Sequence, residues 1–229
     1  MTRIAVPARP EQFEFDPART AILVIDMQND FASEGGMFAG SGGNIATNRA
    51  IVPAIATTLE AARNCGIPVV YIKMGYAPDL SDAGGPDAPN RIKHRRMRVG
   101  EPSASGRGRI LIRGDWGTEV VRELAPKPGE AEIWKTRYSG FFATTLDQHL
   151  QQAGIDTLIV TGCTTSVCVD STVRDAMFRD YRCLVLEDCV AEPIAHAAPR
   201  SNHEASLLTF ELLFAWIGRS DEVTAALAN

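Results

Sequence analysis

The chain has 229 residues, of which 45% are hydrophobic and 22% are charged. This composition is typical of a globular protein, and the length suits one domain covering residues 1–229. A net charge of −5 gives no electrostatic reason to expect a nucleic-acid partner. The sequence has no apolar run long enough for a membrane helix, and its first residues lack the apolar stretch of a signal peptide. We therefore expect a cytoplasmic protein without a membrane partner.

Short apolar runs alternate with helical patterns along the chain. Continuous apolar runs predict buried strands, and apolar residues that recur every three to four positions predict helices. The predicted elements, in chain order, are a strand at residues 21–25, a helix at 51–62, strands at 68–72 and 131–134, a helix at 142–153, a strand at 157–161, a helix at 166–178, a strand at 183–186 and a helix at 203–216. Residues 75–117 are rich in Gly, Pro, Arg and Asp without periodicity, and they are predicted to cover an active site or to form an oligomer contact.

The order of these elements predicts the fold class. Alternation of apolar strands with helices predicts a three-layer α/β/α fold with a mostly parallel central sheet covered on both faces. Binding sites in such sheets lie beyond the carboxyl ends of the strands. Three positions there carry reactive or polar side chains, namely Asp26, Lys135 and the loop at residues 162–168.

Cys168 lies between a predicted strand and a predicted helix. The positive end of the helix dipole is expected to lower the pKa of the thiol and make it nucleophilic. A single cysteine is more often a small buried apolar residue, and we apply that interpretation to Cys65, Cys163, Cys183 and Cys189. The odd number and irregular spacing of the cysteines predict neither a disulfide framework nor a zinc knot.

Asp26 and Lys135 are ambiguous when each is considered alone. Asp26 follows an apolar strand, where it either stabilises a turn or acts as a base that takes and returns a proton. An isolated Lys135 would more often be a surface residue. Beside a thiolate and a carboxylate, its ammonium would favour the anionic thiolate. Because both residues and Cys168 follow predicted strands, we expect them to meet in one pocket.

Three segments together resemble a known signature. DMQNDF at residues 26–31, the strand-end Lys135 and GCTTSVCV at residues 162–169 resemble the isochorismatase-like cysteine hydrolases, and the similarity extends over residues 15–216. The resemblance implies a Rossmann-like topology, an Asp–Lys–Cys triad at Asp26, Lys135 and Cys168, and a cis peptide before Thr164. It also implies an oxyanion hole made by the N–H groups of Thr164 and Cys168, and a homo-oligomer, either a dimer or a tetramer.

Finer motifs resemble the ureide-cleaving branch of this family. Residues 83–90 (AGGPDAPN) and 137–147 (RYSGFFATTLD) are similar to ureidoacrylate amidohydrolases, whereas residues 75–82 (GYAPDLSD) are also similar to biuret hydrolases. The resemblance implies cleavage of a C–N bond in a small N-carbamoyl or ureide substrate through a covalent Cys168 acyl intermediate. The alternatives are a biuret or triuret hydrolase, an N-carbamoylsarcosine-type amidase and, more remotely, a non-catalytic binding member.

Substrate recognition and cofactors follow from the same segments. The candidate substrate-binding residues are Gln28, Phe31, Asn90, Arg91, Lys93, Arg137, Tyr138 and Glu211. Arginine suits a carboxylate because its donors match two oxygens, although the basic run at residues 91–98 is equally well explained as a solvated face. The metal motif of nicotinamidases is missing, since residues 74–76 (MGY) stand in its place. We therefore expect no metal and no other cofactor.

Overall fold

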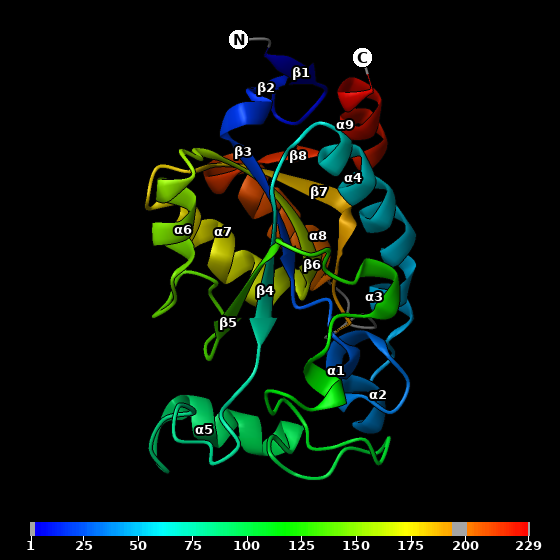
Figure 1. Cartoon of the computed structure of the whole chain (residues 1–229), viewed down its shortest axis with the longest axis vertical. Helices are drawn as coiled ribbons and strands as arrows, with labels where there is room; N and C mark the ends of the chain where they lie inside the picture. The colour runs from blue at the N-terminus through cyan, green and yellow to red at the C-terminus, as the bar shows by residue number, and fades with distance from the viewer. Residues whose placement is uncertain (1–2, 194–200, 229) are drawn as a thin grey trace.

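The computed structural model describes residues 3–193 and 201–228, and in these residues six strands form the central sheet (Figure 1). Their spatial order is β5 (Ala131–Lys135), β4 (Val69–Met74), β3 (Thr20–Ile25), β6 (Thr157–Cys163), β7 (Arg182–Ala191) and β8 (Trp216–Gly218). Each neighbouring pair runs parallel. The strands β1 (Ile4–Val6) and β2 (Phe13–Phe15) pair antiparallel, and they lie with the C-terminal helix at one end of the molecule.

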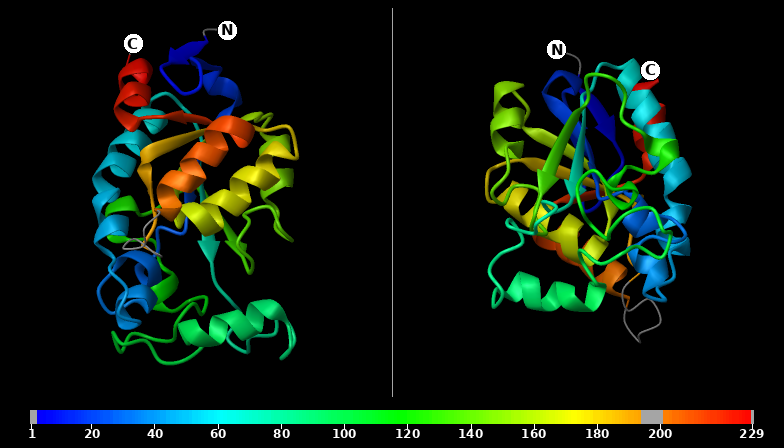
Figure 2. Two further views of the ribbon diagram at one scale, coloured as in Figure 1. Left: turned by 180° about the vertical axis from the view of Figure 1, so that it is seen from behind. Right: turned by 60° about the horizontal axis from the view of Figure 1, so that its bottom comes forward.

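Helices cover both faces of the sheet. The helices of one face are α3 (Ala46–Ala50), α4 (Val52–Asn64) and α9 (Ser220–Leu227), and those of the other are α6 (Leu146–Gln152), α7 (Asp170–Met177) and α8 (Asn202–Thr209) (Figure 2). The side chains of β3 alternate between the two cores: Ile22 and Val24 pack with α4, whereas Leu23 and Ile25 pack with α6 and α7. The predicted three-layer α/β/α fold is therefore confirmed. No helix of the described residues is long and apolar enough to cross a membrane.

Residues 75–117, which we call the cover segment, extend beyond the carboxyl end of β4 (Figure 1). The cover segment contains the short helices α5 (Pro89–His94) and η2 (Arg95–Met97) and the beginning of η3 (Trp116–Thr118). The short helices α1 (Asn29–Ala32) and α2 (Met37–Gly40) follow β3, η1 (Pro17–Arg19) precedes β3, and η4 (Arg122–Leu124) precedes β5. The buried carboxylate of Asp30 accepts hydrogen bonds from the N–H groups of Met37 and Leu111. A Cβ atom at Gly117 would approach that carboxylate to 2.3 Å. Asp30 therefore fixes the cover segment against the loop that follows β3.

Two predicted helices differ from the structure. The helix predicted at residues 142–153 begins only at Leu146, because Ala143 adopts a left-handed φ of 52° and the hydroxyl of Thr144 donates to the carbonyl of Gly140. The helix predicted at residues 203–216 is α8 followed by η6 (Phe210–Phe214), a π-helical turn, and Trp216 begins strand β8. Trp216 pairs with Leu184 of β7 at the edge of the sheet, so its apolar side chain belongs to a strand and not to the predicted helix.

Candidate active site

Three strands place polar side chains at the carboxyl edge of the sheet. Asp26 follows β3, Lys135 ends β5, and β6 leads into η5 (Thr165–Val169), a π-helical turn that contains Cys168 and continues into α7. The strand order reverses around β3 and β6, where such folds bind ligands. Asp26 has a left-handed φ of 51°, which aspartate tolerates better than most residues. Its carboxylate is fully buried among these strand ends.

The ammonium of Lys135 connects the three side chains. Its Nζ atom lies 2.7 Å from Oδ2 of Asp26 and 3.3 Å from Sγ of Cys168. Its third contact is Sδ of Met74, at 3.6 Å. The side chains of Asp26 and Lys135 are both 0% exposed, and Cys168 is 5% exposed. The structure thus brings together a thiol, a carboxylate and an ammonium in a buried site.

Burial changes the proton affinities of all three groups. It raises the pKa of Cys168, the neighbouring Asp26 raises it further, and Lys135 opposes both effects. Burial also raises the pKa of Asp26 against the opposing charge of Lys135. The pKa of Lys135 is raised because Asp26 and Cys168 favour its charged form. We expected a lowered pKa for Cys168, whereas burial and the charge of Asp26 raise it, and the ammonium of Lys135 lowers it in opposition.

The second carboxylate oxygen of Asp26 has a distinct environment. Oδ1 is buried, and it accepts no hydrogen bond from any described N–H or O–H group. A buried carboxylate oxygen without such a donor is costly. This oxygen is thus free to accept a proton beside Cys168, whose thiol interacts with the same carboxylate.

The peptide bond between Cys163 and Thr164 is cis, which confirms the expectation from the resemblance. The loop that carries the nucleophile is also held by residues whose role the sequence analysis missed. The carboxylate of Glu192 accepts hydrogen bonds from both the N–H group and the hydroxyl of Ser166. Glu192 directly follows β7, which ends at Ala191. The sequence analysis ended this strand at residue 186, so it did not examine Glu192 as a residue at the carboxyl end of a strand. A Cβ atom at Gly162 would lie 2.0 Å from the carbonyl oxygen of Ile25, so only glycine fits there.

A cavity of about 230 Å³ has Cys168 and Thr164 in its wall. Its other lining residues are Phe31, Met37, Phe38, Met74, Lys93, His94, Met97, Leu111, Tyr138 and Val167. Most of these side chains are apolar. Burial lowers the pKa of His94 to about 4, so its imidazole is neutral near pH 7. Lys93 is therefore the one charged side chain among the described residues that line this cavity.

Five of the candidate substrate-binding residues lie at this cavity or beside it. Phe31, Lys93 and Tyr138 line it directly. Lys93 and Tyr138 also line an adjoining cavity of about 370 Å³, together with Asn90 and Arg137. The amide of Asn90 donates to the hydroxyl of Tyr76 and to the carbonyl of Ala83. The two cavities thus form an inner chamber at the thiol and an outer one that shares Lys93 and Tyr138.

The other three candidates do not line either of these two cavities. Gln28 is fully buried, and its amide exchanges hydrogen bonds with backbone groups of Met74 and Thr118, so it joins the loop after β3 to the end of β4. Arg91 faces a different cavity. Glu211 forms an ion pair with Arg9 at 3.0 Å and lines a surface cavity without Cys168.

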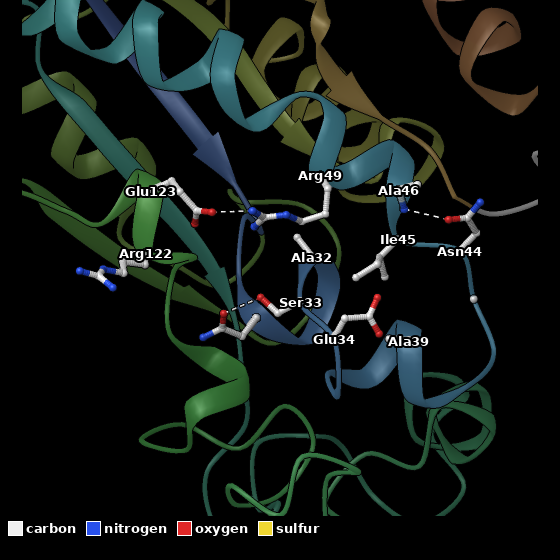
Figure 3. A pocket seen from close by; sticks show the side chains of 12 residues that line it. Ala32, Ser33, Glu34, Ala39, Asn44, Ile45, Ala46, Arg49, Arg122 and Glu123 are labelled. Carbon is white, nitrogen blue, oxygen red and sulfur yellow. Dashed lines mark hydrogen bonds and ion pairs between the residues drawn. The ribbon is translucent and has the colours of Figure 1, made fainter.

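A larger cavity, of about 660 Å³, lies between the loop after α1 and the helix α3 (Figure 3). Its walls include the ion pair of Arg49 with Glu123, and Asn29, which accepts a hydrogen bond from Ser33. None of the candidate site residues lines it. Within residues 3–193 and 201–228, no group of three or more His, Cys, Asp and Glu side chains is arranged to hold a metal ion.

A parallel α/β sheet with a thiol, a carboxylate and an ammonium at its carboxyl edge defines the class of α/β cysteine hydrolases. The family model described as the isochorismatase domain matches residues 20–222. The ureidoacrylate amidohydrolase RutB of Caulobacter segnis is 40% identical over 214 residues, which cover 93% of this chain and 88% of that protein. RutB of Methylobacterium radiotolerans is 38% identical over 93% of this chain and 81% of that protein. The chain therefore belongs to the isochorismatase family.

Solved structures agree with this assignment. A cysteine hydrolase from Pseudomonas syringae pv. phaseolicola superposes with a TM-score of 0.80 at 29% identity, covering 100% of this chain and 99% of that chain. The N-carbamoylsarcosine amidase of Thermoplasma acidophilum superposes with a TM-score of 0.66 at 32% identity, covering 89% of this chain and 98% of that chain. The enzyme class that the sequence predicts, a hydrolase of amide C–N bonds, is confirmed by the names of these relatives.

Proposed function

We propose that the chain hydrolyses the N-carbamoyl group of a small, anionic ureide of the ureidoacrylate type. The observation that carries this proposal is the Lys135 ammonium, which lies 2.7 Å from Asp26 and 3.3 Å from Cys168, the residue that lines a cavity of about 230 Å³. The cavity volume of about 230 Å³ suits a short substrate. The relatives named ureidoacrylate amidohydrolase support the same class of substrate.

The first half of the proposed reaction forms a covalent intermediate. Asp26 takes the proton of the Cys168 thiol, and Lys135 stabilises the thiolate that results. Sulfur attacks the carbonyl carbon of the ureide, and the N–H groups of Thr164 and Cys168 bind the oxyanion that forms. Asp26 then gives its proton to the leaving nitrogen as the C–N bond breaks. An amine leaves, and the acyl group remains on sulfur.

The second half restores the enzyme. A water molecule gives a proton to Asp26 and attacks the acyl carbon, and the C–S bond breaks. The thiolate takes the proton back from Asp26, so one water is consumed for each C–N bond cleaved. Lys135 stays protonated throughout, because the interactions with Asp26 and Cys168 raise its pKa against the opposing effect of burial. Its role in this mechanism is electrostatic, and it transfers no proton.

Lys93 is the group that we propose to bind the substrate carboxylate. It is the charged residue shared by the inner and the outer chamber, and Tyr138 lies beside it in both. An anion at Lys93 would leave the uncharged ureide end in the apolar chamber next to the thiol. Biuret and triuret carry no such charge, so this arrangement favours an anionic ureide over them.

Replacing the nucleophile tests the reaction class. Cys168→Ser should lower ammonia or amine release from ureidoacrylate by at least about 10³-fold, because a serine hydroxyl is a far weaker nucleophile in this setting. Cys65→Ser is the matched control, since Cys65 is an exposed free thiol. Turnover by Cys168→Ser close to that of the unmodified protein would rule out the mechanism, and a folded unmodified protein without turnover on any ureide would favour a binding function.

Replacing Lys93 tests the substrate. Ureidoacrylate, N-carbamoylsarcosine and biuret should be compared with the unmodified protein and with Lys93→Met. The variant should raise KM for the two anionic substrates by about tenfold or more, corresponding to one lost charge-assisted contact, and leave KM for biuret nearly unchanged. Equal effects on charged and neutral ureides would contradict the assignment of Lys93.

We further infer that the protein works as a homo-oligomer in the cytoplasm. Large apolar side chains are exposed near the end of α8 and in η6, where Leu208 is 57%, Leu212 68% and Leu213 66% exposed, and Phe178 of the neighbouring turn is 68% exposed. An exposed apolar group of this kind favours self-association. The five free cysteines of the described residues are typical of a reducing compartment, where disulfides are rare. Light scattering after gel filtration should give at least a dimer, and Leu212→Glu should weaken it.

A further inference from the structure

The basic run at residues 91–98 divides between two cavities. Lys93 faces the chamber that contains Cys168. Arg91, Arg95 and Arg98 line another cavity, of about 230 Å³, on a different face of the same helical segment. Arg91 lies in α5, Arg95 begins η2, and Arg98 follows η2 with a left-handed φ of 56°, so the path of the chain from α5 through this turn brings all three to one cavity. The sequence analysis left open whether this run is a solvated face; Arg95 and Arg98 are indeed exposed, and together with Arg91 they line one cavity.

The charge in this second cavity is only partly compensated. Arg98 pairs with Glu101 at 2.8 Å. The guanidinium of Arg91 donates to the carbonyl of Leu80, and that of Arg95 donates to the carbonyl of Pro86. These carbonyl contacts orient the two guanidinium groups without neutralising them, and no described carboxylate is ion-paired with either. Two uncompensated arginines in one cavity stand out in a chain whose net charge is −5.

The second cavity shares a wall with the substrate chamber. His94 is 3% exposed and lines both cavities. Its Nδ1 atom lies 2.9 Å from the hydroxyl of Tyr76, which also lines the arginine cavity. Lys93 precedes His94 on α5. A ligand held by the arginines would therefore restrain the helix that carries Lys93.

We propose that the cavity lined by Arg91, Arg95 and Arg98 binds a compact oxyanion, and that the bound anion fixes α5 and thereby the position of Lys93. Arginine presents paired N–H donors that match two oxygens of a phosphate or a carboxylate. The two possible sources of this chemistry are a phosphate group and a dicarboxylate. Binding to this cavity does not depend on the proposed reaction. Its expected kinetic effect is a lower KM for the anionic substrate with kcat nearly unchanged.

Isothermal titration calorimetry tests the site directly. Inorganic phosphate and malonate are titrated into the protein at constant ionic strength, with chloride as the reference anion. We expect saturable binding of one of them, and the tighter ligand identifies the source. Arg91→Ala and Arg95→Ala should each weaken binding by about tenfold, as expected for one charge-assisted pair. Arg122→Ala, which removes an exposed arginine of a different cavity, is the matched control.

Lys93→Met separates this site from the substrate chamber. The proposal requires that Lys93→Met keeps the affinity for the anion while the arginine variants lose it. It is overturned if neither anion binds, if binding survives both arginine substitutions, or if Lys93→Met abolishes it. Arg95→Ala is the decisive variant should Arg91→Ala unfold, because Arg95 is exposed and its side chain contacts only one carbonyl among the interactions described.

Discussion

The ion pair of Asp26 and Lys135 offers the sharpest test of the site, through both single variants and the double variant. Lys135→Met removes the ammonium while keeping the length of the side chain, and Asp26→Asn removes the carboxylate charge while keeping its shape. Both side chains are 0% exposed, and the two charged atoms lie 2.7 Å apart. Each single variant therefore leaves one buried charge without its partner.

The expected magnitudes follow from that burial. Removing one partner of a buried pair costs about 3–5 kcal/mol of unfolding free energy, because the remaining charge is uncompensated. Independent effects would thus add to about 6–10 kcal/mol in the double variant. The double variant has neither charge, so we expect it to lose no more than either single variant does. Its kcat should stay reduced by at least about 10³-fold, because the base and the cation are both missing.

Urea unfolding at pH 7, followed by circular dichroism, measures the three free energies, and initial rates of amine release measure turnover. A loss in the double variant equal to the sum of the single losses, within about 0.5 kcal/mol, would refute the view that uncompensated charge causes the destabilisation. Recovery of turnover along with stability would refute the roles assigned to Asp26 and Lys135.

Three further predictions concern pH and backbone. The value of kcat/KM should fall with decreasing pH through a pKa above 3.8, because burial raises the pKa of Asp26 and its unprotonated form is the base; full activity down to pH 3.8 would contradict this. The unfolding free energy should fall as pH decreases from about 6.5 to about 4, since the unfolded chain protonates His94 before the folded one, and His94→Gln should flatten this range of the measured profile. Gly162→Ala should cost at least about 3 kcal/mol in denaturant unfolding, because its Cβ would meet Ile25, whereas Gly154→Ala, with open space around it, should cost about 1 kcal/mol.

The sequence predicts the centre of the fold better than its edges. β3, β4 and β6 are buried along their whole length, so each leaves a continuous apolar run that is easy to recognise. Strands β1, β2 and β8 have only three residues each, too few to establish a period. Trp216 fits a helical spacing as well as a strand, and only its pairing with β7 decides between them.

The site was predictable where it depends on topology and unpredictable where it depends on environment. Asp26, Lys135 and Cys168 were found because parallel strands end at the same edge of a sheet. The direction of the pKa change at Cys168 could not be predicted, because no sequence pattern reports that the thiol is buried beside a carboxylate. The environment of Glu211 was equally unpredictable, since η6 directs its side chain toward Arg9, which lies about 200 residues earlier in the chain.

Strand β5 lies at one edge of the described sheet, yet it supplies the ammonium, which reaches Asp26 past Met74 of β4. A slip of β5 by two residues would keep its inner and outer faces but move Lys135 by about 7 Å, out of reach of sulfur. The hydrophobic core would hardly change, whereas turnover would stop. Enzyme activity in a refolding experiment would therefore count only those molecules whose outermost strand has paired in register.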